Sequence, residues 1–456
     1  MELWVLFQSK WVLLYKVFYE MEMYMQKPEL LAMFQEVDHL YRNVMQVVSA
    51  NPMVLSIVQG MEQRGSQSEA FRTSFSQGIT TMEHIILQLD YMLKAARSQF
   101  PRLYFLSQDE VLGLLTVAPG PSHLVPYVRK CFRNVLDLVL ELEEVPEEGG
   151  SEDQLMSTVA VCGQEGELLK LSTTLRPHSS AVSWLHSLER HIQVSLLQSL
   201  QHCLAERVSL ALAGQPQPPG SDVSETYELS QMTKQLSGFC HSFPLQCCLV
   251  AENVLWCCEM EAGFRGGQGP KAQEQVCSTR IKRLVRNIRQ FFKDCNTKGR
   301  DAYLLLYMQS LLTLLIHHRD VSTELAEAHL TSATSFEWQK VLKYRLALPL
   351  EVAQSHLSQE VLASPAFARL VEGWAQHGEC QMEVLGIRLS YGYEYVGPSS
   401  CQIHTPMTDR MALALMLALH SSQCSALIGP SGVGKIRTLR DLGQRLGRQI
   451  ATLRCY

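Results

Sequence analysis

The sequence has no long uninterrupted hydrophobic run. Its longest apolar stretch, residues 303–316, contains Gln309 and Thr313 and is shorter than the roughly 20 residues that a membrane-spanning helix needs. The first 18 residues are apolar in places, but Glu2 and Lys10 interrupt them and no small-residue cleavage site follows. We therefore expect neither a membrane segment nor a signal peptide.

A strong net charge is also missing. The 40 Lys and Arg residues nearly balance the 45 Asp and Glu residues, which leaves a formal net charge of -5. A balanced chain has no general attraction for nucleic acids or membrane surfaces, so we expect neither as a partner. One local basic pattern is interpreted as a solvated helix face over an apolar stripe; it consists of Arg280, Lys282, Arg283, Arg286, Arg289 and Lys293.

The densest group of cysteines lacks the C-x2-C spacing that zinc sites commonly use. The group consists of Cys240, Cys247, Cys248, Cys257 and Cys258. With no secretory signal, a disulfide framework is not expected either. We interpret these thiols as reduced, buried apolar residues on helices.

Most of the first 390 residues predict helices, because apolar residues return every three or four positions. Residues 77–93 are an example, with their apolar stripe at Ile79, Met82, Ile85, Ile86, Leu89 and Leu93. Ser107 and Glu110 have the spacing of a capping box, which predicts a helix from about Gln108. The length and the 46% hydrophobic content allow two to four domain-sized units.

Breaks between helices are marked by composition. Glycine, proline and acidic residues predict loops at residues 143–153, 214–222 and 263–271. Residues 158–162 and 168–172 predict the two strands of a short hairpin instead of helix. We find no internal repeat of fixed period.

The C-terminal residues change character. Residues 425–429 are a short apolar run, residues 429–435 are rich in glycine, and residues 437–446 have helical spacing. Residues 449–455 predict a second strand. The order predicts one β-loop-α-β unit at this end of the chain.

A phosphate-binding loop pattern, G-x-x-x-x-G-K, lies between the first of these strands and the helix. It comprises Gly429, Pro430, Ser431, Gly432, Val433, Gly434 and Lys435, and Ile436 follows. Glycines let backbone N–H groups turn toward an anion, and the helix N-terminus adds its positive dipole end. Lys435 is the expected charge partner of the β- and γ-phosphates, so we expect ATP as the cofactor.

The position after this lysine lacks a hydroxyl for magnesium. Ile436 stands where the pattern has Ser or Thr. Thr438 does not replace it, because two helical steps turn a side chain by about 200°. We therefore expect phosphates to be held by backbone N–H groups and Lys435 while Mg2+ coordination is impaired. No residue is assigned as a metal ligand or as catalytic.

Together with this loop, several blocks resemble dynein heavy chains. In chain order they are residues 100–107 (FPRLYFLS), 130–132 (KCF), 318–320 (HRD), 336–338 (FEW), 391–395 (YGYEY), 405–410 (TPMTDR), the loop itself and 441–443 (DLG). Their shared order along nearly the whole chain is more specific than any one motif. The sequence resembles a divergent member of this family.

The resemblance implies a mainly α fold, with a helical dynein-type linker over residues 1–395. It also implies the start of the first AAA+ ATPase module over residues 396–456, as an α/β phosphate-loop unit that stops after its second strand. Residues 405–410 are then expected beside the nucleotide base. In the family, the linker bends over an ATP-driven ring during microtubule-based movement, in axonemes or in cytoplasmic transport. A location in the cytoplasm and cytoskeleton, including a cilium or flagellum, follows.

By the same resemblance, the expected partners are dynein intermediate, light intermediate and light chains, with microtubules bound only through parts that lie outside this chain. The family's later carboxylate strand, sensor residues and arginine finger also lie outside it, so we expect no ATPase activity from the chain alone. The alternative is a non-motor product that binds or scaffolds. A kinase is excluded because Leu325 stands where the catalytic-loop Asn would follow residues 318–320. A metalloprotease is excluded because H-E-x-x-H does not occur.

Overall fold

The computed structural model describes residues 2–20, 28–50, 53, 65–116, 120–143, 155–177, 180–213, 238–239, 241–266, 269–298, 302–362, 367–368, 378–398 and 403–453. These residues are mainly α-helical, which confirms the predicted fold class. They fall into two compact units. The first unit comprises Met1–Cys131, Leu142–Ser157 and Arg176–Ser187, and the second comprises Phe132–Glu141, Thr158–Leu175 and Leu188–Tyr456.

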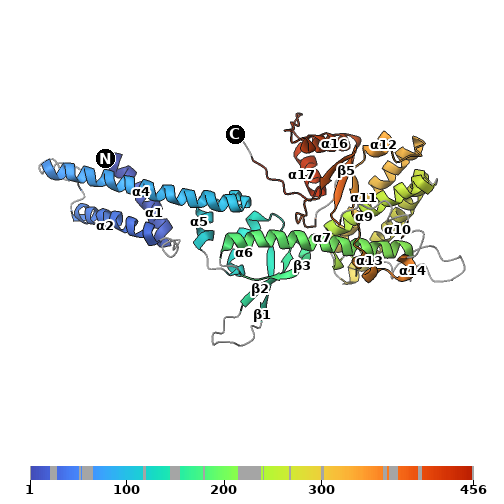
Figure 1. Ribbon diagram of the computed structural model, residues 1–456, viewed down its shortest axis with the longest axis horizontal. Coiled ribbons are helices and arrows are strands. Elements are labelled where there is room, and N and C mark those ends of the chain that lie inside the picture. The colour runs from blue at the N-terminus through green and yellow to red at the C-terminus, as the bar shows by residue number, and fades with distance from the viewer. Residues whose placement is uncertain are drawn as a thin grey trace. The chain divides into compact units, whose positions relative to one another are not determined.

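The first unit is built from helices packed on one long helix. They are α1 (Glu2–Tyr15), η1 (Lys16–Glu20), α2 (Pro28–Ala50), α4 (Gly65–Gln99), η3 (Pro101–Phe105), α5 (Gln108–Thr116) and α6 (Pro121–Cys131). Both α1 and α2 run along α4 (Figure 1). Ring centroids lie 4.4 Å apart for Phe7 and Phe75, and 4.2 Å apart for Trp11 and Tyr41. Gly78 permits the approach of α1, because a Cβ there would lie 2.6 Å from the Phe7 ring.

Two local predictions are confirmed in this unit. The helix predicted at residues 77–93 lies inside α4, and the buried part of its stripe is Ile79, Met82, Ile85, Leu89 and Leu93. The capping box forms at the start of α5. There the Glu110 N–H donates to Ser107 Oγ at 3.2 Å, and the Ser107 N–H donates to Glu110 Oε2 at 3.0 Å.

The predicted hairpin is also confirmed. Strand β2 (Leu155–Cys162) pairs antiparallel with β3 (Leu168–Leu175), so that Val161 lies opposite Leu169. Strand β1 (Asp137–Glu143) adds to β2 in the sheet order β1-β2-β3. The turn between β2 and β3 carries the short helix η4 (Gln164–Gly166).

Glu167, directly after this turn, connects the hairpin to distant parts of the second unit. Its buried carboxylate accepts hydrogen bonds from Tyr303 Oη at 2.8 Å, Tyr395 Oη at 2.5 Å and the Leu245 N–H at 2.7 Å. Burial raises the pKa of Glu167 above its usual value, although these hydrogen bonds oppose the shift. The carboxylate therefore lies at a junction of four chain segments.

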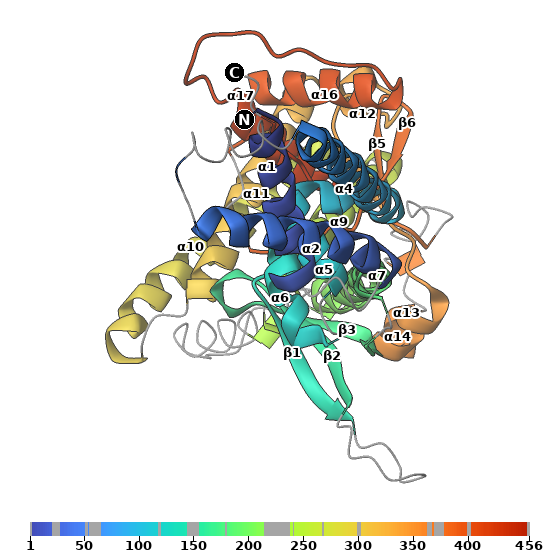
Figure 2. The same ribbon diagram turned by 90° about the vertical axis from the view of Figure 1, so that its left-hand side faces the viewer.

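The rest of the second unit combines long helices with a small sheet. Its helices are the remainder of α7 (Ala181–Ala213), α9 (Leu245–Gly266), α10 (Gly269–Lys298), α11 (Ala302–Glu327), α12 (Phe336–Gln339), α13 (Leu350–His356), α14 (Gln359–Leu362), α16 (Pro406–His420) and α17 (Lys435–Arg445). Strands β4 (Lys343–Arg345), β5 (Gln381–Val384) and β6 (Ile387–Ser390) pair antiparallel in that order. Helix α16 lies beside β6 (Figure 2). None of the described helices is long and apolar enough to cross a membrane.

The loop predicted at residues 263–271 is wrong for its described part. Helix α9 continues to Gly266, and α10 already begins at Gly269. Phe264 explains the continuation, because it is buried and its ring lies 5.8 Å from that of Trp338. The other two predicted loops lie outside the described residues, apart from Glu143 at the end of β1.

The interpretation of the cysteines as buried residues on helices is confirmed where they are described. Cys247, Cys248, Cys257 and Cys258 are buried on α9, whereas Cys240 lies outside the described residues. Burial raises the pKa of Cys257 to about 11, so its thiol stays protonated near neutral pH.

The basic face of α10 is solvated in large part, as predicted. Five of its side chains are exposed, namely Lys282, Arg283, Arg286, Arg289 and Lys293. Arg280 differs, because its Nη2 atom lies 2.6 Å from Oε2 of the buried Glu252 on α9. One residue of this face is therefore part of the packing between α9 and α10.

Candidate functional site

Two glycines with left-handed backbone conformations precede α17. Gly432 and Gly434 both have φ of 86°, which residues with a Cβ rarely adopt. Nothing lies within 4 Å of a Cβ added at either position, so conformation and not crowding demands glycine here. Gly434 is the N-cap of α17 and Lys435 is its first residue. The unpaired N–H groups of the helix N-terminus therefore lie at the end of the loop.

The Lys435 side chain folds over this loop. Its ammonium group donates hydrogen bonds to the carbonyl oxygens of Gly429 and Pro430, both at 2.6 Å. Phosphate oxygens are stronger acceptors for an ammonium than neutral carbonyls are. A bound phosphate can therefore take over these bonds, and the set of backbone N–H groups and one ammonium fits that ligand.

The residues after the lysine provide no hydroxyl to a metal ion beside it. Ile436 is apolar, and 57% of it is exposed. Thr438 is buried, and its hydroxyl donates to the carbonyl oxygen of Gly434 at 3.1 Å. The Thr438 hydroxyl is therefore engaged within the first turn of α17.

The predictions of a strand before the glycine-rich loop and of another after α17 are wrong. Residues 425–429 are described but form no strand, and Ile428 is 96% exposed. Residues 449–453 also form no strand, and residues 454–455 lie outside the described part. A strand exists only through hydrogen bonds to a neighbour, and no described strand pairs with either segment. The predicted helix at 437–446 is present as α17, which begins two residues earlier.

A second motif, residues 405–410, begins α16. Thr405 is the N-cap, and its Oγ1 accepts a hydrogen bond from the Thr408 N–H at 3.3 Å. In return the Thr405 N–H donates to Thr408 Oγ1 at 2.8 Å. Pro406 occupies the first helical turn, where its missing N–H costs nothing. These contacts fix the positions of the side chains that flank the N-cap.

Those side chains line a pocket of about 450 Å3 in the second unit, within the volume range of small-molecule sites. Its walls come from α11, α12 and α16, together with Arg445 at the end of α17. Charged groups of both signs line it, namely Asp320, Glu324, Glu337, Lys340, Asp409, Arg410 and Arg445. Of the block expected beside a nucleotide base, Thr405, Pro406, Asp409 and Arg410 reach this pocket.

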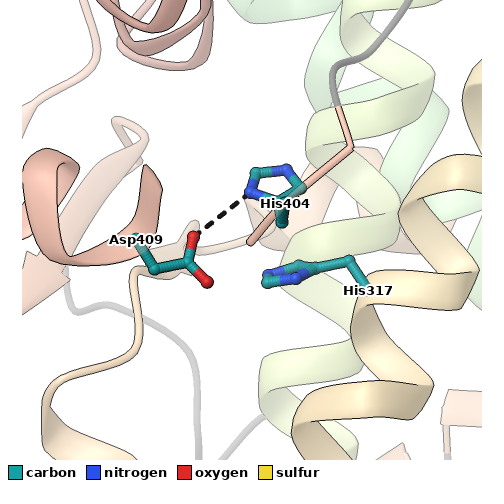
Figure 3. Close-up of side chains that lie close together, drawn as sticks. All are labelled: His317, His404 and Asp409. Atoms are coloured by element: carbon teal, nitrogen blue, oxygen red, sulfur yellow. Dashed lines mark hydrogen bonds and ion pairs between the residues drawn. The ribbon is translucent and has the colours of Figure 1, made fainter. Parts of the chain in front are cut away.

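Sequence reasoning missed two histidines in this pocket. The rings of His317 on α11 and His404 before α16 stack with centroids 4.1 Å apart, and Asp409 lies beside them (Figure 3). Burial, with the nearby charges of His404 and Arg445, lowers the pKa of His317. Burial alone would raise the pKa of Asp409, but the hydrogen bond with His404 and the positive charges nearby lower it. The only available signal was that His404 directly precedes the 405–410 block.

His318, in the neighbouring triplet of residues 318–320, has a structural role. The His318 ring is buried and stacks on Trp256 with centroids 4.2 Å apart, and its Nε2 lies 3.1 Å from Asn253 Oδ1. The triplet lies within helix α11. A buried, stacked histidine inside a helix agrees with the exclusion of a kinase catalytic loop.

The C-terminal end of α17 is fastened by the 391–395 block. The Gly392 N–H donates to the Leu446 carbonyl at 3.0 Å, and the Glu394 N–H donates to the Gly447 carbonyl at 2.7 Å. Gly447 has φ of 59°, and a Cβ there would lie 2.5 Å from the Tyr391 ring. The block thus holds the phosphate-loop helix from its far end.

Gln246 on α9 fixes the same block from the other side. Its Nε2 donates to Tyr391 Oη at 2.6 Å and to the Glu394 carbonyl at 2.8 Å. Its Oε1 accepts from the Val396 N–H at 2.9 Å. Every polar atom of this buried amide side chain that can bond is therefore used to position residues 391–396.

Two family profiles match the chain. Residues 1–203 match the profile described as dynein heavy chain, N-terminal region 2. Residues 391–456 match the profile described as hydrolytic ATP binding site of dynein motor region. The second match contains the 391–395 block, the 405–410 block and the glycine-rich loop.

Curated relatives align along the whole chain. The human dynein heavy chain domain-containing protein 1 is 30% identical over 479 residues, and its mouse counterpart is 29% identical over 475 residues. Human dynein axonemal heavy chain 6 is 26% identical over 469 residues. Each alignment covers 100% of this chain but only 10% of the relative. The chain therefore spans about a tenth of the length of these proteins.

Proposed function

Because the chain belongs to the dynein heavy chain family, we propose that its glycine-rich loop holds the phosphates of ATP. One observation carries the proposal. Two left-handed glycines, an ammonium held over the loop and the start of an 11-residue helix coincide at residues 432–435. These are the donors that anion sites at helix N-termini use. The family match at residues 391–456 to an ATP binding site supports the choice of ligand.

In this proposal, residues 1–395 form a dynein-type linker and residues 396–456 begin the first AAA+ module. The phosphate site consists of Gly429, Pro430, Ser431, Gly432, Val433, Gly434, Lys435 and Ile436. The start of the matched ATP-binding-site profile at residue 391 supports a boundary in this region, where residues 391–396 are bonded both to Gln246 and to the end of α17. Here the helical part and the nucleotide unit are fastened together.

For the whole heavy chain we propose ATP-driven, microtubule-based movement in an axoneme or in cytoplasmic transport. Relatives named as axonemal dynein heavy chains support this proposal and a cytoskeletal or ciliary location. Dynein intermediate, light intermediate and light chains are the proposed partners. Contact with microtubules is assigned to parts of the heavy chain outside these 456 residues.

Ile436 favours a second candidate, a heavy chain that binds nucleotide without turning it over. An apolar side chain at this position removes one of the few protein ligands that magnesium uses beside a phosphate loop. Ile436 is 57% exposed, so water can reach this position. Its side chain has no oxygen that could bind the metal ion. In this reading the product binds or scaffolds and does not act as a motor.

The phosphate site is tested by titrating the full chain with a fluorescent ATP analogue. Charge-assisted hydrogen bonds contribute about 1.5–3 kcal/mol, so Lys435→Ala should weaken binding roughly 10- to 100-fold. Lys282→Ala removes an exposed lysine of α10 and should leave binding unchanged. Equal affinity of Lys435→Ala and the native chain would show that this loop does not hold the phosphates.

The same titration with and without Mg2+ separates the two candidates. The native chain should depend little on Mg2+, whereas Ile436→Thr should gain affinity when Mg2+ is added, because it restores a hydroxyl ligand. A strong Mg2+ dependence of the native chain, with no gain in Ile436→Thr, would disprove the role given to Ile436. The Lys435→Ala result would still stand by itself.

A further inference from the structure

Three side chains with metal-binding groups meet at the wall of the pocket (Figure 3). His317 comes from α11, and His404 and Asp409 flank the N-cap of α16. His404 Nδ1 lies 3.3 Å from Asp409 Oδ1. The two imidazole rings stack with an interplanar angle of 29°.

The surroundings hold these groups in place and leave one side accessible. The capping box between Thr405 and Thr408 fixes the first turn of α16, and with it the separation of His404 from Asp409. The His404 side chain is 10% exposed and that of Asp409 is 45% exposed. All three residues line the same pocket, so a water or a small ligand can reach them.

We propose that His317, His404 and Asp409 bind Zn2+ or a similar divalent transition-metal ion and so fasten α11 to the start of α16. Two imidazoles and one carboxylate are a ligand set for such ions. With three protein ligands, the fourth position opens to the pocket, as it does in sites that exchange a water. The proposal does not depend on nucleotide binding at the loop.

The distances between the three ligand atoms suit a site whose side chains move slightly inward when the ion binds. One ligand atom from each residue lies within 4.8 Å of the other two. Around a tetrahedral Zn2+ with bonds of about 2.0–2.1 Å, neighbouring ligand atoms lie about 3.3 Å apart. Small rotations of the two rings and the carboxylate cover this difference. Metal binding then replaces the stack of two imidazoles by bonds from both rings to one ion.

Arg445 opposes the ion and therefore tunes the site. Its Nη1 atom lies 3.5 Å from His404 Nδ1, and another contact places it 4.0 Å from Asp441 Oδ2. The positive guanidinium of Arg445 and a bound dication repel each other. When the Arg445 side chain turns away from the ion, it can still pair with Asp441. Because Arg445 ends the phosphate-loop helix α17, metal binding should displace a side chain of that helix.

The test is calorimetric titration of the full chain with Zn2+ alone, after treatment with a chelator. Changes to groups that merely support metal ligands cost about 10- to 100-fold in affinity, so His317→Ala and Asp409→Asn should each weaken Zn2+ binding at least tenfold. Arg445→Gln should tighten it roughly tenfold, because the repulsion disappears. Co2+ in place of Zn2+ should give the visible absorption bands of a tetrahedral site.

His202→Ala is the matched control. His202 and His356 form another histidine pair, with Nδ1 and Nε2 atoms 2.7 Å apart, and losing it should leave the Zn2+ affinity unchanged. Weaker binding through misfolding cannot imitate the gain expected of Arg445→Gln. Unchanged binding in His317→Ala, lost binding in His202→Ala or no gain in Arg445→Gln each overturns the site.

Discussion

Replacing Glu252 by glutamine should lower the free energy of unfolding by about 3 kcal/mol at pH 7. Glu252 lies on α9 with only 3% of its side chain exposed. Its carboxylate pairs with Arg207 of α7 and with Arg280 of α10, the latter at 2.6 Å. Three helices therefore share one buried negative charge, and its loss removes the carboxylate that pairs directly with both guanidinium groups.

The magnitude follows from the pKa of this carboxyl. Burial alone would raise it, but the charges and hydrogen bonds of Arg207 and Arg280 outweigh burial and lower it from 4.5 to about 2. Each pKa unit corresponds to about 1.4 kcal/mol, so the shift corresponds to about 3 kcal/mol. The same order is measured when one partner of a buried pair is removed.

The pH dependence has a definite sign. Because the pKa is lower in the folded state, the contribution is complete above the unfolded value of about 4.5 and is lost as the pH falls through about 2. Glu252→Gln carries no such titration. The difference in the free energy of unfolding between the native chain and the variant should therefore shrink from about 3 kcal/mol at pH 7 toward zero near pH 2.

The assay is urea unfolding at pH 7, 5 and 3, followed by tryptophan fluorescence. Trp256 is a suitable reporter, because it is buried on the same helix as Glu252. Glu337→Gln is the control, since Glu337 pairs with Lys340 at the surface and such pairs contribute at most about 1 kcal/mol. A gap below 1 kcal/mol at pH 7, or a gap that is the same at pH 7 and pH 3, would refute the reasoning.

Two smaller substitutions test local geometry. Ser107→Ala removes one half of the capping box with Glu110 and should cost about 1 kcal/mol of stability, measured by urea unfolding; no loss would mean that the box contributes nothing. Gly447→Ala places a Cβ against the Tyr391 ring at positive φ. It should lower the stability more than Gly386→Ala does. A Cβ at Gly386 meets nothing within 4 Å, so that variant bears only about 1–2 kcal/mol of backbone strain. Equal melting temperatures for the two glycine variants would contradict this.

The parts of the fold that obey short-range rules could be predicted from the sequence. The spacing of apolar residues located the helix at 77–93. The Ser107 and Glu110 pair located the start of α5. The hairpin at 158–172 was predictable because both strands lie close together in the chain and pair with each other. In each case the interacting groups are near neighbours in sequence.

The errors arose where distant partners decide the structure. Residues 425–429 have the composition of a strand, but no described strand pairs with them. Residues 263–266 contain glycines typical of a loop, but Phe264 packs against Trp338 and keeps them in α9. Local composition does not tell whether a distant strand will pair with residues 425–429 or whether Trp338 will pack against Phe264.

The candidate site divides in the same way. The proposed phosphate loop is a continuous motif, so its glycines and Lys435 could be put forward as candidates from the sequence. The pocket is not continuous, because His317 on α11 meets His404 only through packing of the second unit. Periodicity marks α11 as a helix but cannot say which residue of another segment will lie against it.

The C-terminal end of α17 is bonded through its backbone to other segments of the second unit. Its N-terminus lies at the phosphate loop, while the carbonyl groups of Arg445, Leu446 and Gly447 accept hydrogen bonds from other segments. The donor to Arg445 is the Tyr344 hydroxyl at 3.0 Å, from strand β4. A helix with its backbone bonds intact moves as a rigid body, so a ligand that shifts its N-terminus must also load these three bonds. We expect a shift of α17 on nucleotide binding to reach residues 391–396 and β4 through these bonds.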